Sequence, residues 1–292
     1  MSQVALQKLT MKIIKTPKEM ASLVRGLREK NKKIGFVPTM GYFHEGHLSL
    51  IRQAKKDNDI VVVSIFVNPT QFAPGEGYNT YPRDFKTDSK LAKSVGCDII
   101  FNPSVRSMYT GNPLTYVEVS GLSKVMCGST RPNHFKGVTT ICTKLFNIIA
   151  PDIAYFGQKD YQQAIIIKQL VFDLNMNLRI KIMPIVREKN GLAMSSRNKY
   201  LSQRQRESAS TIYKSLKHAN ALIKSGAKNS SNVKAAIKKM LLKEKDILID
   251  YIKIVNPDLL TDKNEIDSRV LIALAVKIGR TRLIDNIIVN SV

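Results

Sequence analysis

The chain has 292 residues and a formal net charge of +23, with 43% hydrophobic and 24% charged residues. This composition predicts a globular protein of one large or two modest domains and excludes a disordered chain. No apolar run approaches the ~18 residues of a membrane-spanning helix. The cysteines, Cys97, Cys127 and Cys142, have no CxxC spacing. We therefore expect reduced thiols in a cytoplasmic protein, with neither a zinc site nor a membrane partner.

The large positive charge raises the question of nucleic-acid binding. Nucleic-acid-binding proteins usually concentrate basic residues in a stripe and interleave aromatic residues with them. Here lysines and arginines occur along the whole chain, and tryptophan is absent. Solvated, lysine-rich helix faces explain such a pattern better. The sequence therefore counts against a nucleic-acid partner.

Strand-like and helix-like segments alternate through the first two-thirds of the chain. The predicted strands are 34–37, 60–67, 98–101, 152–156 and 179–186, and the predicted helices are 47–57, 84–96, 137–149 and 159–173. Continuous Val/Ile strands predict a parallel sheet that is buried on both faces. The alternation predicts an α/β fold with a Rossmann-like, doubly wound sheet, whose ligands bind beyond the carboxyl ends of the strands.

The pattern changes after about residue 187. Lysine-rich helices near 202–224 and 230–245 precede strands near 247–255, 268–278 and 281–289, which predicts a smaller C-terminal α+β domain. We therefore expect two domains, residues 1–186 and 187–292. The first ten residues look like an appendage that precedes Met11.

The segment Pro38–His47 links a predicted strand to a predicted helix. It ends at a helix N-terminus, where free N–H groups and the helix dipole favour phosphate. His44 and His47, three residues apart, would face the same side and donate hydrogen bonds to phosphate oxygens. The alternatives are a zinc site, which would need histidines four apart in HExxH and a third ligand, or incidental surface histidines. The context favours a nucleotide site for chemistry at the phosphates.

Two other loops carry groups that suit phosphates. Ala193–Asn198 offers two hydroxyls and an arginine, although alone it is as typical of a helix N-cap. In Gly157–Asp160, Lys159 would be a mobile cation, and Asp160 could cap the next helix or orient the lysine; an ordinary helix start is the alternative. A histidine loop (Pro38–His47) that is followed later in the chain by a Ser-Ser-Arg loop (Ala193–Asn198) is similar to the two signatures of adenylyl-transferring enzymes.

Polar side chains also follow a strand in Asn68–Phe72, where amides and an aromatic ring would suit a small polar acid. Arg131 and His134 stand before the next helix and could also bind substrate. An ordinary surface turn is the alternative interpretation of this segment. His218, on a lysine-rich helix, has no assigned role.

The order and spacing of these segments resemble the pantothenate synthetase (pantoate–β-alanine ligase) family over about residues 11–292. Related nucleotidylyltransferases would share only the histidine loop. The matching segments are Val37–Gly41, His44–His47, Val63–Phe72, Tyr81–Arg83, Arg131–Val138, Phe156–Asp160, Leu192–Asn198 and Leu283–Asn286.

The resemblance implies a two-step, Mg²⁺-dependent reaction. ATP would adenylate the carboxylate of (R)-pantoate and release pyrophosphate, and the amine of β-alanine would then attack the adenylate to give pantothenate and AMP. No covalent enzyme nucleophile is needed, because the site holds two anions together and neutralises the developing charge. The resemblance also implies a homodimer and a C-terminal lid.

The resemblance assigns site residues by motif. His47 is the residue usually given an acid role. Gln71 and Gln163 would bind pantoate, Gln71 also β-alanine, and Asp88 would help to hold Mg²⁺. The remaining substrate-site residues are Pro38, Thr39, Arg131 and His134. The catalytic group comprises His47, His44, Lys159, Ser195, Ser196 and Arg197. The ATP-binding group comprises Met40, Gly41, Tyr42, Phe43, His44, Glu45, Gly46, His47, Gly157, Gln158, Lys159, Asp160, Val186, Met194, Ser195, Ser196 and Arg197.

Two other functions stay open. A nucleotidylyltransferase that stops at the adenylate would release pyrophosphate without forming an amide. A basic nucleic-acid-binding module would lose affinity steeply as salt rises.

Overall fold

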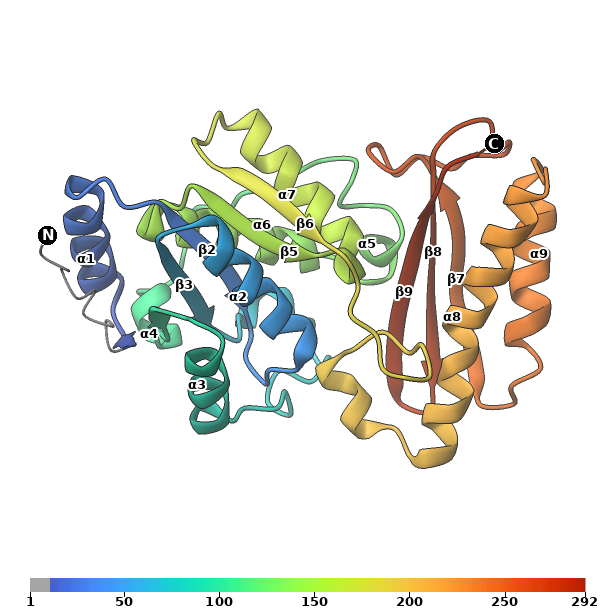
Figure 1. Ribbon diagram of the computed structural model, residues 1–292, viewed down its shortest axis with the longest axis horizontal. Helices are drawn as coiled ribbons and strands as arrows, with labels where there is room; N and C mark the ends of the chain where they lie inside the picture. The colour runs from blue at the N-terminus through green and yellow to red at the C-terminus, as the bar shows by residue number, and fades with distance from the viewer. Residues whose placement is uncertain (1–10, 292) are drawn as a thin grey trace, which may run out of the picture.

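The computed structural model describes residues 11–291, so the predicted appendage at residues 1–10 lies outside the described part. The larger of its two sheets has six parallel strands in the order β1-β4-β3-β2-β5-β6 (Figure 1). Its strands are β1 Lys12–Ile14, β2 Ile34–Thr39, β3 Ile60–Ile65, β4 Ile99–Phe101, β5 Ile153–Gly157 and β6 Arg179–Met183. This sheet confirms the predicted Rossmann-like architecture.

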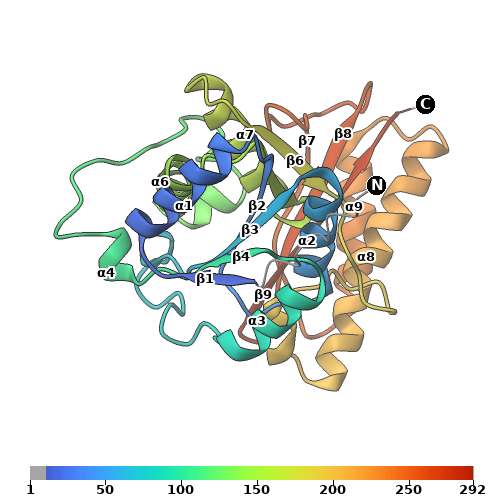
Figure 2. The same cartoon turned by 60° about the vertical axis from the view of Figure 1, so that its left-hand side comes forward.

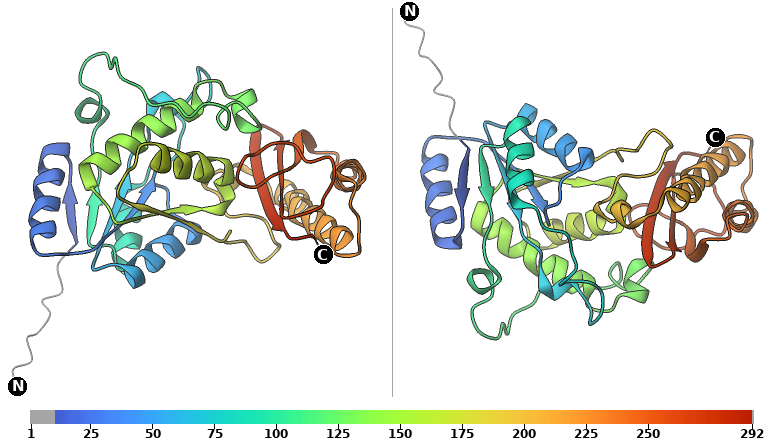
Figure 3. Two further views of the ribbon diagram at one scale, coloured as in Figure 1. Left: turned by 90° about the horizontal axis from the view of Figure 1, so that it is seen from above. Right: turned by 90° about the horizontal axis from the view of Figure 1, so that it is seen from below.

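Helices cover both faces of this sheet (Figures 2 and 3). The helices α1 Pro17–Glu29, α6 His134–Ile149 and α7 Tyr161–Asp173 pack in sequence on one face, and α2 Glu45–Asp57 and α3 Phe85–Ser94 pack on the other. Shorter helices lie in the connections: η1 Pro69–Gln71, α4 Val105–Met108, α5 Cys127–Thr130, η2 Gln158–Asp160 and η3 Ser196–Tyr200.

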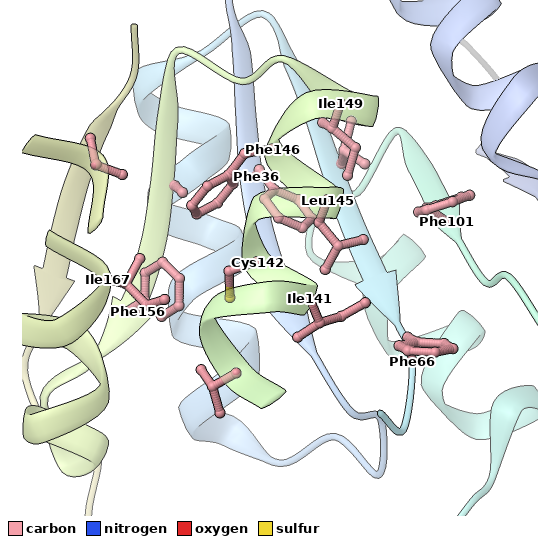
Figure 4. Close-up of a cluster of buried hydrophobic side chains, with 14 of the residues drawn as sticks. Phe36, Phe66, Phe101, Ile141, Cys142, Leu145, Phe146, Ile149, Phe156 and Ile167 are labelled. Atoms are coloured by element: carbon pink, nitrogen blue, oxygen red, sulfur yellow. The ribbon is translucent and has the colours of Figure 1, made fainter. Parts of the chain in front are cut away.

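The core between the sheet and α6 fixes where that helix lies (Figure 4). Phe36 of β2 meets Phe146 of α6 edge to face, with ring centroids 6.3 Å apart. Phe101 and Phe156 are buried in the same cluster. Because aromatic pairs of this kind add to ordinary apolar burial, α6 is held firmly across the sheet.

The smaller sheet is antiparallel, in the order β7-β8-β9, and the helices α8 and α9 pack against it (Figure 1). Its elements are α8 Gln203–Lys224, α9 Ser230–Leu241, β7 Ile247–Val255, β8 Val270–Ile278 and β9 Thr281–Val289. Each sheet has its own apolar core, and a further cluster, with Tyr161 and Ile165 on one side and Leu271 on the other, joins the two units. The predicted α+β unit is present, whereas the division at residues 186 and 187 stays a prediction.

The structure differs from the sequence prediction mainly at the N-terminal end. β1 and α1 are absent from the predicted set, although Thr16 caps α1 and Pro17 occupies its first turn, a typical helix start. α6 begins at His134 rather than 137, and α9 ends at Leu241 rather than 245. Residues 158–160 form η2, so α7 begins only at Tyr161.

The order of the strands determines where a ligand would bind. β2 lies between β3 and β5, and the chain moves outward in opposite directions from these two neighbours. In a doubly wound sheet this reversal leaves a crevice beyond the carboxyl ends of the two central strands. The crevice therefore lies beside Thr39 and Gly157. Within residues 11–291, no helix combines the length and apolarity required to cross a membrane.

Candidate active site

A cavity of about 230 Å³ lies at this position. Segments that are far apart in the sequence meet around it, from the end of β2 to the start of η3. The predicted site residues that line it are Pro38, Thr39, Met40, His44, Gly46, His47, Gln71, Gly157, Lys159, Asp160, Gln163, Val186, Met194, Ser195, Ser196 and Arg197. The predicted residues that do not line it are Gly41, Tyr42, Phe43, Glu45, Gln158, Arg131, His134 and Asp88.

Asp88 of α3 holds the backbone of the histidine loop in place. Gly41 and Tyr42 both have positive φ, 82° and 57°. A Cβ on Gly41 would lie only 2.9 Å from a carboxylate oxygen of Asp88, so this position requires glycine. The backbone N–H groups of Tyr42 and Phe43 donate to the two oxygens of Asp88, each at 2.7 Å. Asp88 thus fixes the backbone that leads into α2.

His44 and His47 form a reciprocal cap at the start of α2. Nδ1 of His44 accepts from the N–H of Gly46 at 3.1 Å, and Nδ1 of His47 accepts from the N–H of His44 at 3.3 Å. A nitrogen that accepts a hydrogen bond carries no proton. In the neutral rings the proton therefore sits on Nε2, the nitrogen that stays free to donate to a ligand in the cavity.

Both imidazoles are kept neutral. Burial, assisted by the charge of Lys159, lowers the pKa of His44 from 6.5 to about 4. Burial also lowers the pKa of His47 well below its usual value, with further contributions from His44 and Lys159. At neutral pH the pair therefore offers two N–H donors without a positive charge.

Lys159 supplies a cation to the same cavity. Its side chain is 18% exposed, and Nζ lies 3.9 Å from the carboxylate of Asp160. The side-chain amide of Asn286 in β9 donates to the carbonyls of Gln158 and Lys159, at 2.9 and 3.0 Å. In return, Nε2 of Gln158 donates a hydrogen bond to Oδ1 of Asn286 at 3.2 Å. The small sheet therefore fixes the backbone that carries the lysine.

The Ser-Ser-Arg loop meets the histidine loop directly. Ser196 Oγ donates to the backbone carbonyl of Tyr42 at 3.2 Å, across 154 positions of the chain. Ser195 caps η3 by accepting from the N–H of Arg197 at 3.2 Å. The N-cap interpretation and the phosphate interpretation of this loop are therefore compatible, because the same turn caps η3 and lines the cavity.

The rest of the cavity combines amides with an apolar wall. Gln71 is buried, and its Nε2 contacts the sulfur of Met40 at 3.0 Å. Gln163, near the start of α7, lines the same cavity. The apolar wall comes largely from one side of α6 and its neighbours: Leu50, Phe66, Val138, Ile141, Cys142 and Leu145, of which Figure 4 labels four. This part suits a small branched acid that has both polar and apolar surface.

Arg131 and His134 line a larger neighbouring cavity of about 1270 Å³, between the two units, that shares Lys159 and Arg197 with the first. Arg131 pairs with Glu76 and lies 2.9 Å from Nε2 of His134, whose Nδ1 is 2.8 Å from the carbonyl of Gln71. Arg131 and His134 are therefore connected to the smaller cavity by the contact of His134 with Gln71, which lines it. The prediction that they bind substrate stays a prediction.

The structure gives other contacts to three further predicted residues. Glu45 forms an ion pair with Arg52, and Gln158 bonds to Asn286. Asp88 uses both oxygens for the histidine loop, which favours positioning over Mg²⁺ coordination. Across residues 11–291, no group of three or more His, Cys, Asp or Glu side chains is arranged to hold a metal ion.

Several residues at or near the site are missing from the predicted roles. Tyr81 lines both cavities, and burial raises the pKa of its hydroxyl. Arg187 forms a bidentate ion pair with Asp285 of β9, with N–O distances of 2.6 and 2.9 Å. This pair links the small sheet to the segment that precedes Met194. Ser64 lines the smaller cavity from within β3. The segments that contain Ser64, Tyr81 and Asp285 gave a sequence signal through the family resemblance, which assigned these three residues no role, and Arg187 gave none.

Comparisons with known proteins agree with this geometry. Residues 12–288 match the family model described as pantoate-beta-alanine ligase. A protein named pantothenate synthetase from Acetivibrio thermocellus is 53% identical over 280 residues, which cover 96% of this chain and all of the relative. One from Thermotoga petrophila is 52% identical with the same coverage.

Solved structures give the same result. A pantothenate synthetase from Thermus thermophilus superposes with a TM-score of 0.90 at 38% identity, covering 95% of this chain and 99% of that one. A pantoate-beta-alanine ligase from Francisella tularensis, complexed with beta-gamma ATP and beta-alanine, gives 0.79 at 38% identity, covering 95% and 97%. The predicted fold class, family and ligase activity are confirmed: the chain belongs to the pantoate-beta-alanine ligase family.

Proposed function

We propose that this cavity condenses (R)-pantoate with β-alanine to form pantothenate, through a pantoyl adenylate, with ATP converted to AMP and pyrophosphate. The observation that carries the proposal is that two sets of groups line one cavity. The neutral histidine pair, Lys159 and the Ser-Ser-Arg loop form a set suited to phosphates. Gln71 and Gln163 beside the apolar wall form a set suited to a hydroxy acid.

In the first step a carboxylate oxygen of pantoate attacks the α-phosphorus of ATP. The new O–P bond forms as the bond to the β-phosphate oxygen breaks, and pyrophosphate leaves with the electron pair. Negative charge moves onto oxygens that face Nε2–H of His44 and His47 and the ammonium of Lys159. Donors fixed in place before the reaction stabilise such charge at little reorganisation cost. His47 would thus act by donating a hydrogen bond from Nε2.

In the second step the amine of β-alanine attacks the acyl carbon of the adenylate. The C–N bond forms, the acyl C–O bond to AMP breaks, and the nitrogen, which attacks as the neutral amine, gives one proton to water and keeps the other as the amide N–H. Ser195, Ser196 and Arg197 would hold the phosphate of the departing AMP. The site gains rate chiefly by keeping the two reactants adjacent.

The donor set fits Mg²⁺ that is carried by the nucleotide. Mg²⁺ usually keeps several waters and binds through substrate phosphates and one or two carboxylates. Asp160 is the one carboxylate among the described residues that line the smaller cavity, and it could contribute a ligand. The ion would neutralise phosphate charge when bound. Asp88 fits this role less well, because its oxygens already hold the histidine loop.

We also propose a cytoplasmic location, a homodimer and a lid function for residues 187–292. The three free cysteines support a reducing compartment. The large cavity between the two units supports a lid, because residues of both units line it. Light scattering of the purified protein would test the dimer.

The test is AMP formation with ATP, Mg²⁺ and pantoate, with and without β-alanine. We expect AMP release that depends on β-alanine, with one pantothenate formed for each AMP. Pyrophosphate release without an amide product would instead identify a nucleotidylyltransferase that stops at the adenylate. No turnover of ATP would overturn the proposal.

A further inference from the structure

Ser64 of β3 carries a buried hydroxyl that the fold leaves unused. The residue is 1% exposed, and within residues 11–291 its Oγ has no hydrogen-bond partner. In the sheet Ser64 pairs with Pro38 of β2 and Phe101 of β4, and its carbonyl accepts from Thr39 Oγ1 at 2.6 Å. A buried hydroxyl without a partner destabilises the fold, so alanine would be the more stable choice for folding alone.

The position of Ser64 explains why such a group would be present. Five buried side-chain atoms lack a partner among the described residues: Asn58 Oδ1, Ser64 Oγ, Ser89 Oγ, Asn198 Oδ1 and Ser230 Oγ. Of these five residues, Ser64 is the one that lines the cavity of about 230 Å³. Its neighbours in the lining include Phe66 and Val138, which offer no hydrogen bonds. The hydroxyl of Ser64 therefore lies in the lining of the cavity, beside apolar side chains, and is the one side-chain atom of this unpartnered group that a ligand in the cavity could serve.

We propose that Ser64 Oγ hydrogen-bonds a hydroxyl group of pantoate. This rests on the proposed function and extends it to how the acid is recognised. Pantoate has two hydroxyls on either side of a carbon with two methyl groups. The methyl groups suit the wall formed by Ile141 and Leu145, and a hydroxyl beside them needs a partner on that same wall.

The other groups of the cavity leave this role open. The carboxylate of pantoate has to face the α-phosphate of ATP, and therefore the donors His44, His47 and Lys159. Gln71 and Gln163 can bind one hydroxyl and the second carboxylate oxygen, which leaves the other hydroxyl for Ser64. A site that hydrogen-bonds a substrate hydroxyl discriminates strongly against an analogue without it, because its own polar group is then left unpaired. Ser64 is thus a residue that determines specificity.

The experiment compares Ser64→Ala with wild type on pantoate, 2-deoxypantoate and 4-deoxypantoate. For pantoate we expect kcat/KM to fall about five- to tenfold, the loss of one neutral hydrogen bond, mainly through KM. KM for ATP should not change. For the analogue that lacks the partner hydroxyl, wild type and Ser64→Ala should be equally active, and this identifies the hydroxyl.

Ser230→Ala is the matched control, because it removes another fully buried hydroxyl without a partner, in α9 and outside the cavity. Both variants should melt at or above the wild-type temperature, and only Ser64→Ala should lose pantoate affinity. A KM for pantoate equal to that of wild type would overturn the proposal, as would the same loss on all three acids. Failure of the wild type to make pantothenate would instead overturn the proposed function.

Discussion

The side-chain amide of Asn286 in β9 donates a hydrogen bond to the backbone carbonyl of Lys159, 3.0 Å away, and a second to the carbonyl of Gln158. The lysine of the cavity is therefore positioned by the other sheet. We predict that Asn286→Ala lowers kcat about tenfold, because the η2 backbone loses two hydrogen bonds and Lys159 is held less firmly. KM for pantoate should change little. Steady-state kinetics with each substrate varied in turn would measure both effects.

The double variant Asn286→Ala/Lys159→Ala separates positioning from general destabilisation. If Asn286 acts through Lys159, adding Asn286→Ala to a protein that already carries Lys159→Ala should lower kcat only slightly further. Additive losses in kcat would contradict this role.

Lys159→Ala and His47→Ala should each lower turnover by ~10²-fold or more, because each removes a donor that faces the developing charge. The melting temperature should stay close to that of wild type. Exposed residues of the same type, Lys168 of α7 and His218 of α8, provide controls as Lys168→Ala and His218→Ala. Activity within a few-fold of wild type in both site variants would refute the assignment.

Stability should depend on pH through the buried histidines. Burial lowers the pKa of His44 from 6.5 to about 4, and burial with the nearby Arg131 lowers that of His134 to about 4. Between these values the unfolded chain binds protons that the folded chain does not. The free energy of unfolding should therefore fall as pH decreases from about 6.5 to about 4, by up to about 1.4 kcal/mol per pH unit for each histidine.

Urea denaturation at several pH values would measure this effect. His44→Gln should show a smaller decrease than wild type, because glutamine does not titrate. His218→Gln, which changes an exposed histidine, should match wild type. Parallel curves for His44→Gln and wild type would show that His44 does not contribute.

Asp88→Asn should distinguish positioning from metal binding. The amide keeps one good acceptor for the N–H groups of Tyr42 and Phe43, and its NH₂ faces the other N–H. We predict a loss of about 1–3 kcal/mol in stability, because a buried donor is left unpaired, together with a lower kcat. The Mg²⁺ concentration for half-maximal activity should stay unchanged. A large rise in that concentration would make Asp88 a metal ligand after all.

Most of the fold could be predicted because its strands are strongly apolar and its helices amphipathic. Ile60–Ile65 has no polar residue before Ser64, which is typical of a strand buried on both faces. β1 is harder to detect, since it has only three residues and one of them is buried. The start of α7 was misplaced because η2 occupies the first three positions after Gly157.

The site was predictable where its residues stand in short motifs. The histidine loop, Lys159 and the Ser-Ser-Arg loop all line the cavity. The contacts between the motifs were not predictable, since Asn286 and Lys159 are 127 positions apart and spacing carries no information on such pairs. Ser64 lies within a segment that resembles the family, but the sequence gave it no role of its own, because a serine in an apolar strand looks like any other strand residue. Its importance appears only when its missing partner and its cavity are seen together.

Tyr42 makes its contacts with the rest of the site through its backbone. Its N–H donates to Asp88 and its carbonyl accepts from Ser196, while its ring lies beside Lys199, with Nζ 4.4 Å from the ring centroid. The bridge between the two phosphate loops therefore does not depend on the identity of the side chain at this position. What the position demands is a residue that tolerates φ of 57°, and glycine or asparagine would adopt it more easily than tyrosine. A change of side chain at residue 42 should therefore leave the link between the histidine loop and the Ser-Ser-Arg loop intact, because both hydrogen bonds of that link are made by the backbone.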